Sequence, residues 1–141
     1  MRLISIIGTR PQIVKASAFS RIAEKKTGIE EIMVHTGQHY DRELSDLFFE
    51  ELEIKRPKYN LAVGSASHAV QTAEMMVKLE EIVEIENPQA MMVYGDTNST
   101  LAAALVAAKS HIPLAHVESG LRSFNKFMPE EINRIGTHRF A

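Results

Sequence analysis

The amino-acid sequence predicts an α/β protein built on a doubly wound parallel sheet, and two observations support this prediction. First, a unit of strand, turn and helix recurs four times, because short apolar runs alternate with longer segments whose apolar residues have helical spacing. Second, the chain has 141 residues, 45% of them hydrophobic, which is enough to bury the core of a single domain over residues 1–141. Such alternation predicts parallel strands with helices on both faces.

The first unit comprises a strand over residues 2–7 and a helix over residues 13–23. The strand is an apolar run that Gly8 ends, and residues 8–10 form the turn. Pro11 suits the first position of a helix. Apolar residues then recur at helical spacing and define the expected buried face: Val14, Ala18 and Ile22, with Phe19 and Ala23.

The second and third units follow the same order. A strand over residues 32–36 ends at Gly37, and Asp41 can cap a helix that runs to about residue 51. Residues 55–67 read as a loop, and residues 68–86 as a long amphipathic helix. Its expected inward residues are Ala69, Ala73, Met76, Val77, Leu79, Ile82 and Val83.

The last part of the chain carries two further predicted strands. Residues 91–94 form a strand, and the alanine-rich residues 97–109 form a helix whose small side chains permit close packing on the sheet. A strand over residues 114–117 is followed by a polar turn, and a short helix is expected after Pro129.

The composition excludes several classes of function. The formal net charge is −2, which argues against general binding to nucleic acid or to a membrane surface. There are no cysteines, so disulfides and thiolate chemistry are excluded, and the six histidines form no tight ligand motif for a metal. The amino-terminal apolar run is too short to span a membrane and has no signal-peptide cleavage region, so we expect a cytoplasmic protein.

Ligands of such sheets bind at the carboxyl ends of the strands, and polar side chains gather there in this sequence. The candidates after the four predicted strands are Arg10 and Lys15, then Gln38 and His39, then Asp96, then Glu118 and Arg122. Residues 8–11 lack the spacing of a dinucleotide or Walker motif. They do place backbone N–H groups and Arg10 at a helix start, which suits a phosphate, although a plain tight turn is equally compatible.

The acidic candidates each have a structural alternative. Asp96 could cap the following helix, although Thr97 can do so equally well. Glu118, at the end of a buried strand, suits acid–base catalysis, or else it forms an ion pair with Arg122. Glu130 and Glu131 begin a helix, where negative charge is favourable without any function.

Taken together, the motifs GTRPQ with Lys15, TGQHYD, YGDTNSTLA, HVESGLRS and MPEEINR resemble the amino-terminal part of the non-hydrolysing UDP-N-acetylglucosamine 2-epimerases. The resemblance runs from residue 8 to about residue 135. The motifs TGQHYD and FNKFMPEEINR also resemble those of the branch of enzymes that epimerises UDP-2,3-diacetamido-2,3-dideoxy-glucuronate. Gln12 stands where a glutamate is common in the family.

The resemblance implies the first of two Rossmann-like domains that face each other, as in B-type glycosyltransferases, with the nucleotide between them. The second domain would then be missing from this chain, which by itself we expect to fold but not to turn over substrate. The implied reaction inverts carbon 2 of the sugar by elimination and re-addition of UDP, and it needs no metal or redox cofactor. A homodimer is also implied.

By the same resemblance, Arg10 and Lys15 face the phosphates, and Asp96, Glu118 and Glu130 occupy the acidic catalytic positions. Gln38, His39 and Arg122 are the further substrate-binding candidates. Two other functions remain open. One is a non-catalytic half-domain that binds sugar nucleotides, and the other is half of a B-type glycosyltransferase. The three acids fit epimerisation better than simple transfer.

Overall fold

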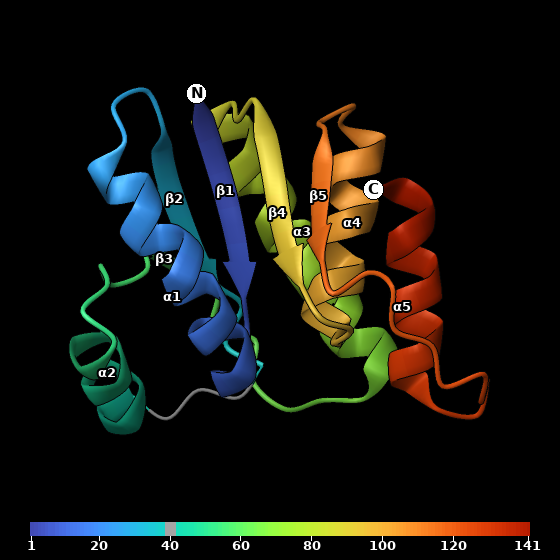
Figure 1. Cartoon of the computed structure of the whole chain (residues 1–141). Coiled ribbons are helices and arrows are strands. Elements are labelled where there is room, and N and C mark those ends of the chain that lie inside the picture. The colour runs from blue at the N-terminus through green and yellow to red at the C-terminus, as the bar shows by residue number, and fades with distance from the viewer. Residues whose placement is uncertain (39–41) are drawn as a thin grey trace.

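A five-stranded parallel sheet forms the centre of the protein, with the strand order β3-β2-β1-β4-β5 (Figure 1). The computed structural model describes residues 1–38 and 42–141. The strands are β1 (Arg2–Ile7), β2 (Glu30–His35), β3 (Tyr59–Asn60), β4 (Ala90–Tyr94) and β5 (Leu114–Val117). Every neighbouring pair is parallel. The strand order reverses between β1 and β4, which is where ligands bind in open sheets of this kind.

Helices cover both faces of this sheet, which confirms the predicted doubly wound α/β class. They are α1 (Arg10–Lys25), α2 (Arg42–Glu51), α3 (His68–Glu86), α4 (Asn98–Lys109) and α5 (Pro129–Phe140). In Figure 1, α1 lies in front of the sheet, whereas α3 and α4 lie behind it and α5 stands beyond β5. None of the helices in the described part of the chain is long and apolar enough to cross a membrane.

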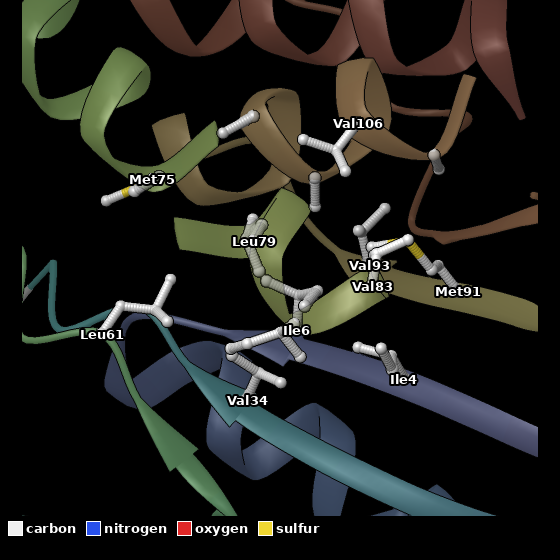
Figure 2. Close-up of a cluster of buried hydrophobic side chains, with 14 of the residues drawn as sticks. Ile4, Ile6, Val34, Leu61, Met75, Leu79, Val83, Met91, Val93 and Val106 are labelled. Carbon is white, nitrogen blue, oxygen red and sulfur yellow. The ribbon is translucent and has the colours of Figure 1, made fainter. Parts of the chain in front are cut away.

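The larger core lies between the sheet and the pair of helices α3 and α4. Figure 2 shows Ile4 and Ile6 of β1 pointing toward Leu79 and Val83 of α3, and Val106 of α4 closes the same cluster. Helix α4 presents buried alanines to the sheet, as the sequence predicts, and these are Ala102, Ala103 and Ala107. Small side chains let this helix lie close to the strands, which brings its first turn to the carboxyl ends of the sheet.

The predicted buried face of α1 is wrong for Val14 and Ile22, which are 47% and 56% exposed, and it holds for Ala23, which is buried. Ile13 and Ala16, which were not predicted, are also buried. The buried side of α1 also carries small or polar residues, namely Gln12, Ser17 and Ser20. The short side chains of Ser17 and Ser20 allow close approach to the sheet, so apolar character did not mark the side of α1 that packs.

Helix α3 has the predicted bounds but only part of the predicted face. Leu79, Ile82 and Val83 are buried as expected, and Met76 packs partly against the core. Ala69, Ala73 and Val77 are exposed. Met75 is fully buried in their place.

Three further differences concern secondary structure. The short strand β3 lies in the segment predicted as a loop, and α5 extends for 12 residues rather than forming a short helix. Strand β2 begins at Glu30, two residues before its predicted start, because it pairs with β1 over its whole length. Asp41, the predicted cap of α2, lies outside the described residues.

Candidate functional site

The turns that follow β1, β2 and β4 meet tightly at one end of the sheet. A Cβ atom on Gly8 would lie 2.3 Å from Ser99 Oγ and 2.4 Å from Thr36 Oγ1, so only glycine fits there. The two hydroxyls are themselves hydrogen-bonded at 2.8 Å. The first turn of α4 is therefore fixed against the ends of two strands, as a rigid site requires.

The buried side chain of Gln12 joins the first of these turns to the third. Its Oε1 accepts the N–H groups of Gly8 at 2.8 Å and Thr9 at 3.2 Å. Its Nε2 donates to the carbonyl of Tyr94 at 2.7 Å and contacts the hydroxyls of Thr97 and Thr100 at 3.0 and 3.1 Å. A side-chain amide accepts and donates at the same time, and Gln12 thereby connects the two turns.

Gln38, a predicted substrate-binding residue, contacts the start of α4. Its Oε1 accepts from the hydroxyl of Ser99 at 2.7 Å and from the Ser99 N–H at 3.3 Å. The carbonyl oxygen of its side chain is therefore engaged within the protein. His39, the other candidate at this turn, lies outside the described residues.

Asp96 does not cap helix α4, because Thr97 is the N-cap residue and forms a capping box with Thr100. The carboxylate of Asp96 instead accepts hydrogen bonds from the guanidinium of Arg134, from Nε at 3.1 Å and also from Nη2. The capping alternative for Asp96 is thus wrong, and its side chain is held by α5.

Arg134 is itself anchored by a buried carboxylate, that of Glu131. The Glu131 side chain is 1% exposed and accepts from Arg134 Nη1 at 2.5 Å. It also accepts the backbone N–H groups of Ser123 and Phe124 at 3.0 and 3.1 Å. The pKa of Glu131 is lowered, mainly by the hydrogen bond from the Ser123 N–H. The Phe124 N–H and the charge of Arg134 act in the same direction, whereas burial alone would raise this pKa.

The two adjacent glutamates of the MPEEINR motif therefore differ. Glu131 is buried and structural, whereas Glu130, the predicted catalytic acid, is exposed at the first turn of α5. The hydrogen bond to Asp96 raises the pKa of Arg134, and the charges of Asp96, Glu131 and Glu130 contribute in the same direction.

Sequence reasoning missed Glu131, Asn133 and Arg134 as residues that build the site. Asn133 Nδ2 donates to the carbonyl of Asp96 at 3.0 Å and to Asn98 Oδ1 at 3.1 Å. The signal was present in the motif, because Glu131 and Arg134 are three residues apart and share one helix face.

Glu118 forms an ion pair with Lys15 of α1, from the other end of the chain. The predicted alternative, a pair between Glu118 and Arg122, is wrong. Arg122 Nη1 donates to the carbonyl of Ser119 at 2.7 Å within its own loop. Glu118 also has a φ of +68°, a left-handed conformation that is costly for a residue with a Cβ atom and is concentrated at functional sites.

The remaining cationic candidates are Arg10 and Arg122. Arg10, exposed at the start of α1, has its guanidinium carbon 5.9 Å from the centre of the Phe48 ring of α2. Arg122 lines a cavity of about 710 Å³ beside α5, together with Lys126, His138 and Arg139 among others. The structure thus pairs Lys15 with Glu118, whereas Arg10 contacts α2 and Arg122 lines the cavity beside α5.

Two histidines, the buried His35 and the half-buried His116, contact the turns at the strand ends. His116 Nε2 contacts the carbonyl of Gly95 at 2.7 Å, so this nitrogen carries the proton, and burial lowers the pKa of His116. His35 Nδ1 accepts the N–H of Gly37 at 2.9 Å. Burial lowers the pKa of His35 to about 4, so its ring is neutral at physiological pH.

Comparison with known proteins gives a consistent result. A family model described as UDP-N-acetylglucosamine 2-epimerase matches residues 21–141. The chain is 54% identical over 141 residues to a UDP-N-acetylglucosamine 2-epimerase homolog of Methanococcus maripaludis, covering 39% of that protein. It is 50% identical over 141 residues to the UDP-2,3-diacetamido-2,3-dideoxy-D-glucuronate 2-epimerase of Pseudomonas aeruginosa, covering 40% of it. In both cases the whole chain is matched.

Solved structures agree with these sequence relatives. The Methanocaldococcus jannaschii UDP-GlcNAc 2-epimerase, in complex with UDP-GlcNAc and UDP, has a TM-score of 0.94 and 49% identity. The Neisseria meningitidis enzyme bound to UDP-GlcNAc has a TM-score of 0.93 and 32% identity. All of this chain is covered in each case, but only 39% and 38% of those proteins. The chain thus spans about two-fifths of the length of the relatives that it matches.

Proposed function

Because this chain belongs to the UDP-N-acetylglucosamine 2-epimerase family, we propose that it supplies the first of two domains of an enzyme that interconverts UDP-GlcNAc and UDP-ManNAc. The observation that carries this proposal is the position of two carboxylates, Asp96 and Glu118. They follow the neighbouring strands β4 and β5 at the carboxyl ends of the sheet, and β4 borders the point where the strand order reverses. Each is held by a cation from another element, Arg134 or Lys15.

The proposed reaction proceeds in two balanced steps. A carboxylate removes the proton from carbon 2, the electron pair of the broken C–H bond forms a double bond between carbons 1 and 2, and UDP leaves with the pair of the C1–O bond. In the return step, UDP adds to carbon 1 and an acid delivers a proton to the other face of carbon 2. The reaction thus needs a base, an acid and cations for the diphosphate.

This chain offers candidates for each role. Asp96, Glu118 and Glu130 share the acid–base work in our proposal, and Arg10 and Lys15 neutralise the diphosphate. Gln38, His39 and Arg122 complete the set of substrate-binding candidates. The placement of Lys15 at Glu118 supports a site in which the leaving group and a catalytic carboxylate are close together.

Two alternatives have specific support. The 50% identity to the Pseudomonas aeruginosa relative favours a UDP-2,3-diacetamido-2,3-dideoxy-glucuronate substrate equally well. The pairs Lys15–Glu118 and Arg134–Asp96 would serve equally in a domain that binds a sugar nucleotide without catalysis. If the protein is an enzyme, we further propose that it is a cytoplasmic homodimer and that its second domain can come from another chain. We also propose a role in cell-envelope polysaccharide biosynthesis.

The test adds the part of the relatives that this chain does not cover. The 141-residue chain is fused to, or mixed with, the remaining carboxy-terminal part of the Methanocaldococcus jannaschii enzyme, to which it is 50% identical over the matched region. Each sugar nucleotide is incubated with it in deuterated water, and deuterium at carbon 2 is measured by mass spectrometry. We expect deuterium incorporation with both parts present and none with the chain alone.

Matched variants identify the acids. Asp96→Asn, Glu118→Gln and Glu130→Gln should each lower the exchange rate by about 10²-fold or more. The same change at the exposed Glu53 should leave the rate unchanged. Exchange of the glucuronate alone would reassign the substrate, and exchange of neither sugar would support the non-catalytic alternative.

A further inference from the structure

The ion pair between Lys15 and Glu118 is accessible to solvent. It joins helix α1 to the turn after β5, two segments 103 residues apart in the sequence. The two side chains keep 32% and 37% of their surface exposed, so a solute can reach both. Pairs with this much exposure contribute little to stability, because water competes for both charges.

Lys15 lies where a diphosphate would compete for it. Its Nζ is 3.9 Å from the position that a Cβ atom on Gly95 would take, so the amine lies over the turn that leads to Asp96. It therefore stands between the turns that follow β4 and β5. A diphosphate carries more negative charge than one carboxylate and offers more acceptor oxygens, so it attracts an ammonium group more strongly.

The backbone of Glu118 has an unfavourable conformation for a residue with a side chain. Its φ of +68° places a side chain with a Cβ atom in the left-handed region. Such conformations are retained where the surrounding contacts impose them. The contact with Lys15 occupies this carboxylate.

We infer that Lys15 exchanges partners when a diphosphate binds: it leaves Glu118 for the phosphate oxygens, and the Glu118 carboxylate becomes free to act on the sugar. The inference rests on the proposed function for the role of Glu118, but the exchange itself requires only a diphosphate. It makes the catalytic carboxylate available when a ligand with a leaving group is bound and keeps it paired otherwise.

The experiment measures binding of inorganic pyrophosphate to the 141-residue chain by isothermal titration calorimetry in a double-mutant cycle. Glu118→Gln should tighten binding by about two- to fivefold, because Lys15 no longer has to break an ion pair. Lys15→Met should weaken binding, and in that background Glu118→Gln should bring no gain. Glu24→Gln is the matched control, because Glu24 lies on α1 as Lys15 does. Its side chain is 33% exposed and pairs with Lys55, outside that helix, at 3.5 Å, and the change should have no effect.

Three results would overturn the exchange. They are weaker or unchanged binding in Glu118→Gln, equal affinity of the wild-type and Lys15→Met proteins, and the same gain from Glu118→Gln in both backgrounds. The last would mean simple relief of charge repulsion. A second measurement uses the unsubstituted protein: the ¹³C carboxyl signal of Glu118 should move on pyrophosphate titration, and a signal that stays in place contradicts the exchange. A positive cycle without deuterium exchange at carbon 2 would leave this inference standing and reject the epimerase proposal instead.

Discussion

The side-chain amide of Gln12 donates to the carbonyl oxygen of Tyr94 at 2.7 Å and so joins the first turn of α1 to the last residue of β4. The same side chain accepts the N–H of Gly8 at 2.8 Å. Two strand-to-helix turns that carry candidate residues, Arg10 on one and Asp96 on the other, are thereby held at a fixed separation. A buried polar group that is fully satisfied in this way specifies one geometry, because any shift leaves a partner unpaired.

Replacing Gln12 by leucine should lower the free energy of unfolding by about 2–3 kcal/mol, because the buried N–H of Gly8 loses its acceptor. Gln12→Glu keeps an oxygen for the N–H groups of Gly8 and Thr9 and should cost less. Urea denaturation followed by circular dichroism measures both. A leucine variant as stable as the wild type would show that this amide does not hold the turns together.

Replacing Gly8 by alanine should cost about 1–3 kcal/mol, because the new methyl group would overlap the hydroxyls of Ser99 and Thr36. Gly120→Ala is the matched control: a Cβ atom there meets no heavy atom within 4 Å. This control should stay within about 0.5 kcal/mol of the wild type. Thermal unfolding of the three proteins at one pH gives the comparison, and equal losses in both variants would contradict the close approach at Gly8.

The adjacent residues Glu130 and Glu131 should respond differently to the same substitution. Glu131→Gln removes the charge that holds Arg134 and should lower the urea midpoint clearly, whereas Glu130→Gln should leave the midpoint nearly unchanged because Glu130 is exposed.

The pH dependence gives a second readout for Glu131. Its pKa is lower in the folded protein than the ordinary 4.5, so the unfolded chain binds the proton first as the pH falls. The stability that Glu131 contributes is therefore present above pH 4.5 and is lost as the pH falls through the lowered folded value. Glu131→Gln should flatten the stability curve in this acidic range, and a curve parallel to that of the wild type would contradict the assignment.

His35 should make the protein less stable in mildly acidic solution. Its pKa is about 4 in the folded protein against an ordinary value of 6.5, so below pH 6.5 the unfolded chain takes up a proton that the folded chain does not. Stability should fall between pH 6.5 and pH 4 by up to about 3 kcal/mol from this residue.

Chemical denaturation at a series of pH values tests the effect of His35. His35→Asn keeps a side-chain acceptor for the N–H of Gly37 but cannot be protonated in this range. Its stability should therefore depend less on pH between 6.5 and 4 than that of the wild type. An equally steep loss in the variant would assign the effect to another group.

The sequence alone determined the order and type of the main elements. The predicted ranges 68–86 and 114–117 agree with α3 and β5 as they stand in the structure, because these elements are marked by local signals. The same local signals placed the polar candidates at the carboxyl ends of the strands. The choice of Thr97 over Asp96 as the cap of α4 remained open, since both residues can accept the necessary hydrogen bond.

Only the tertiary structure decided which side chains meet. Asp96 and Arg134 are 38 residues apart, and Lys15 and Glu118 are 103 residues apart. Such pairs depend on the strand order, which sets β4 between β1 and β5, and an alternation of strands and helices does not specify that order. The packed face of α1 was undetermined for a related reason: it carries short side chains such as Ala16 and Ser20, and a pattern of apolar residues does not detect a face of that kind.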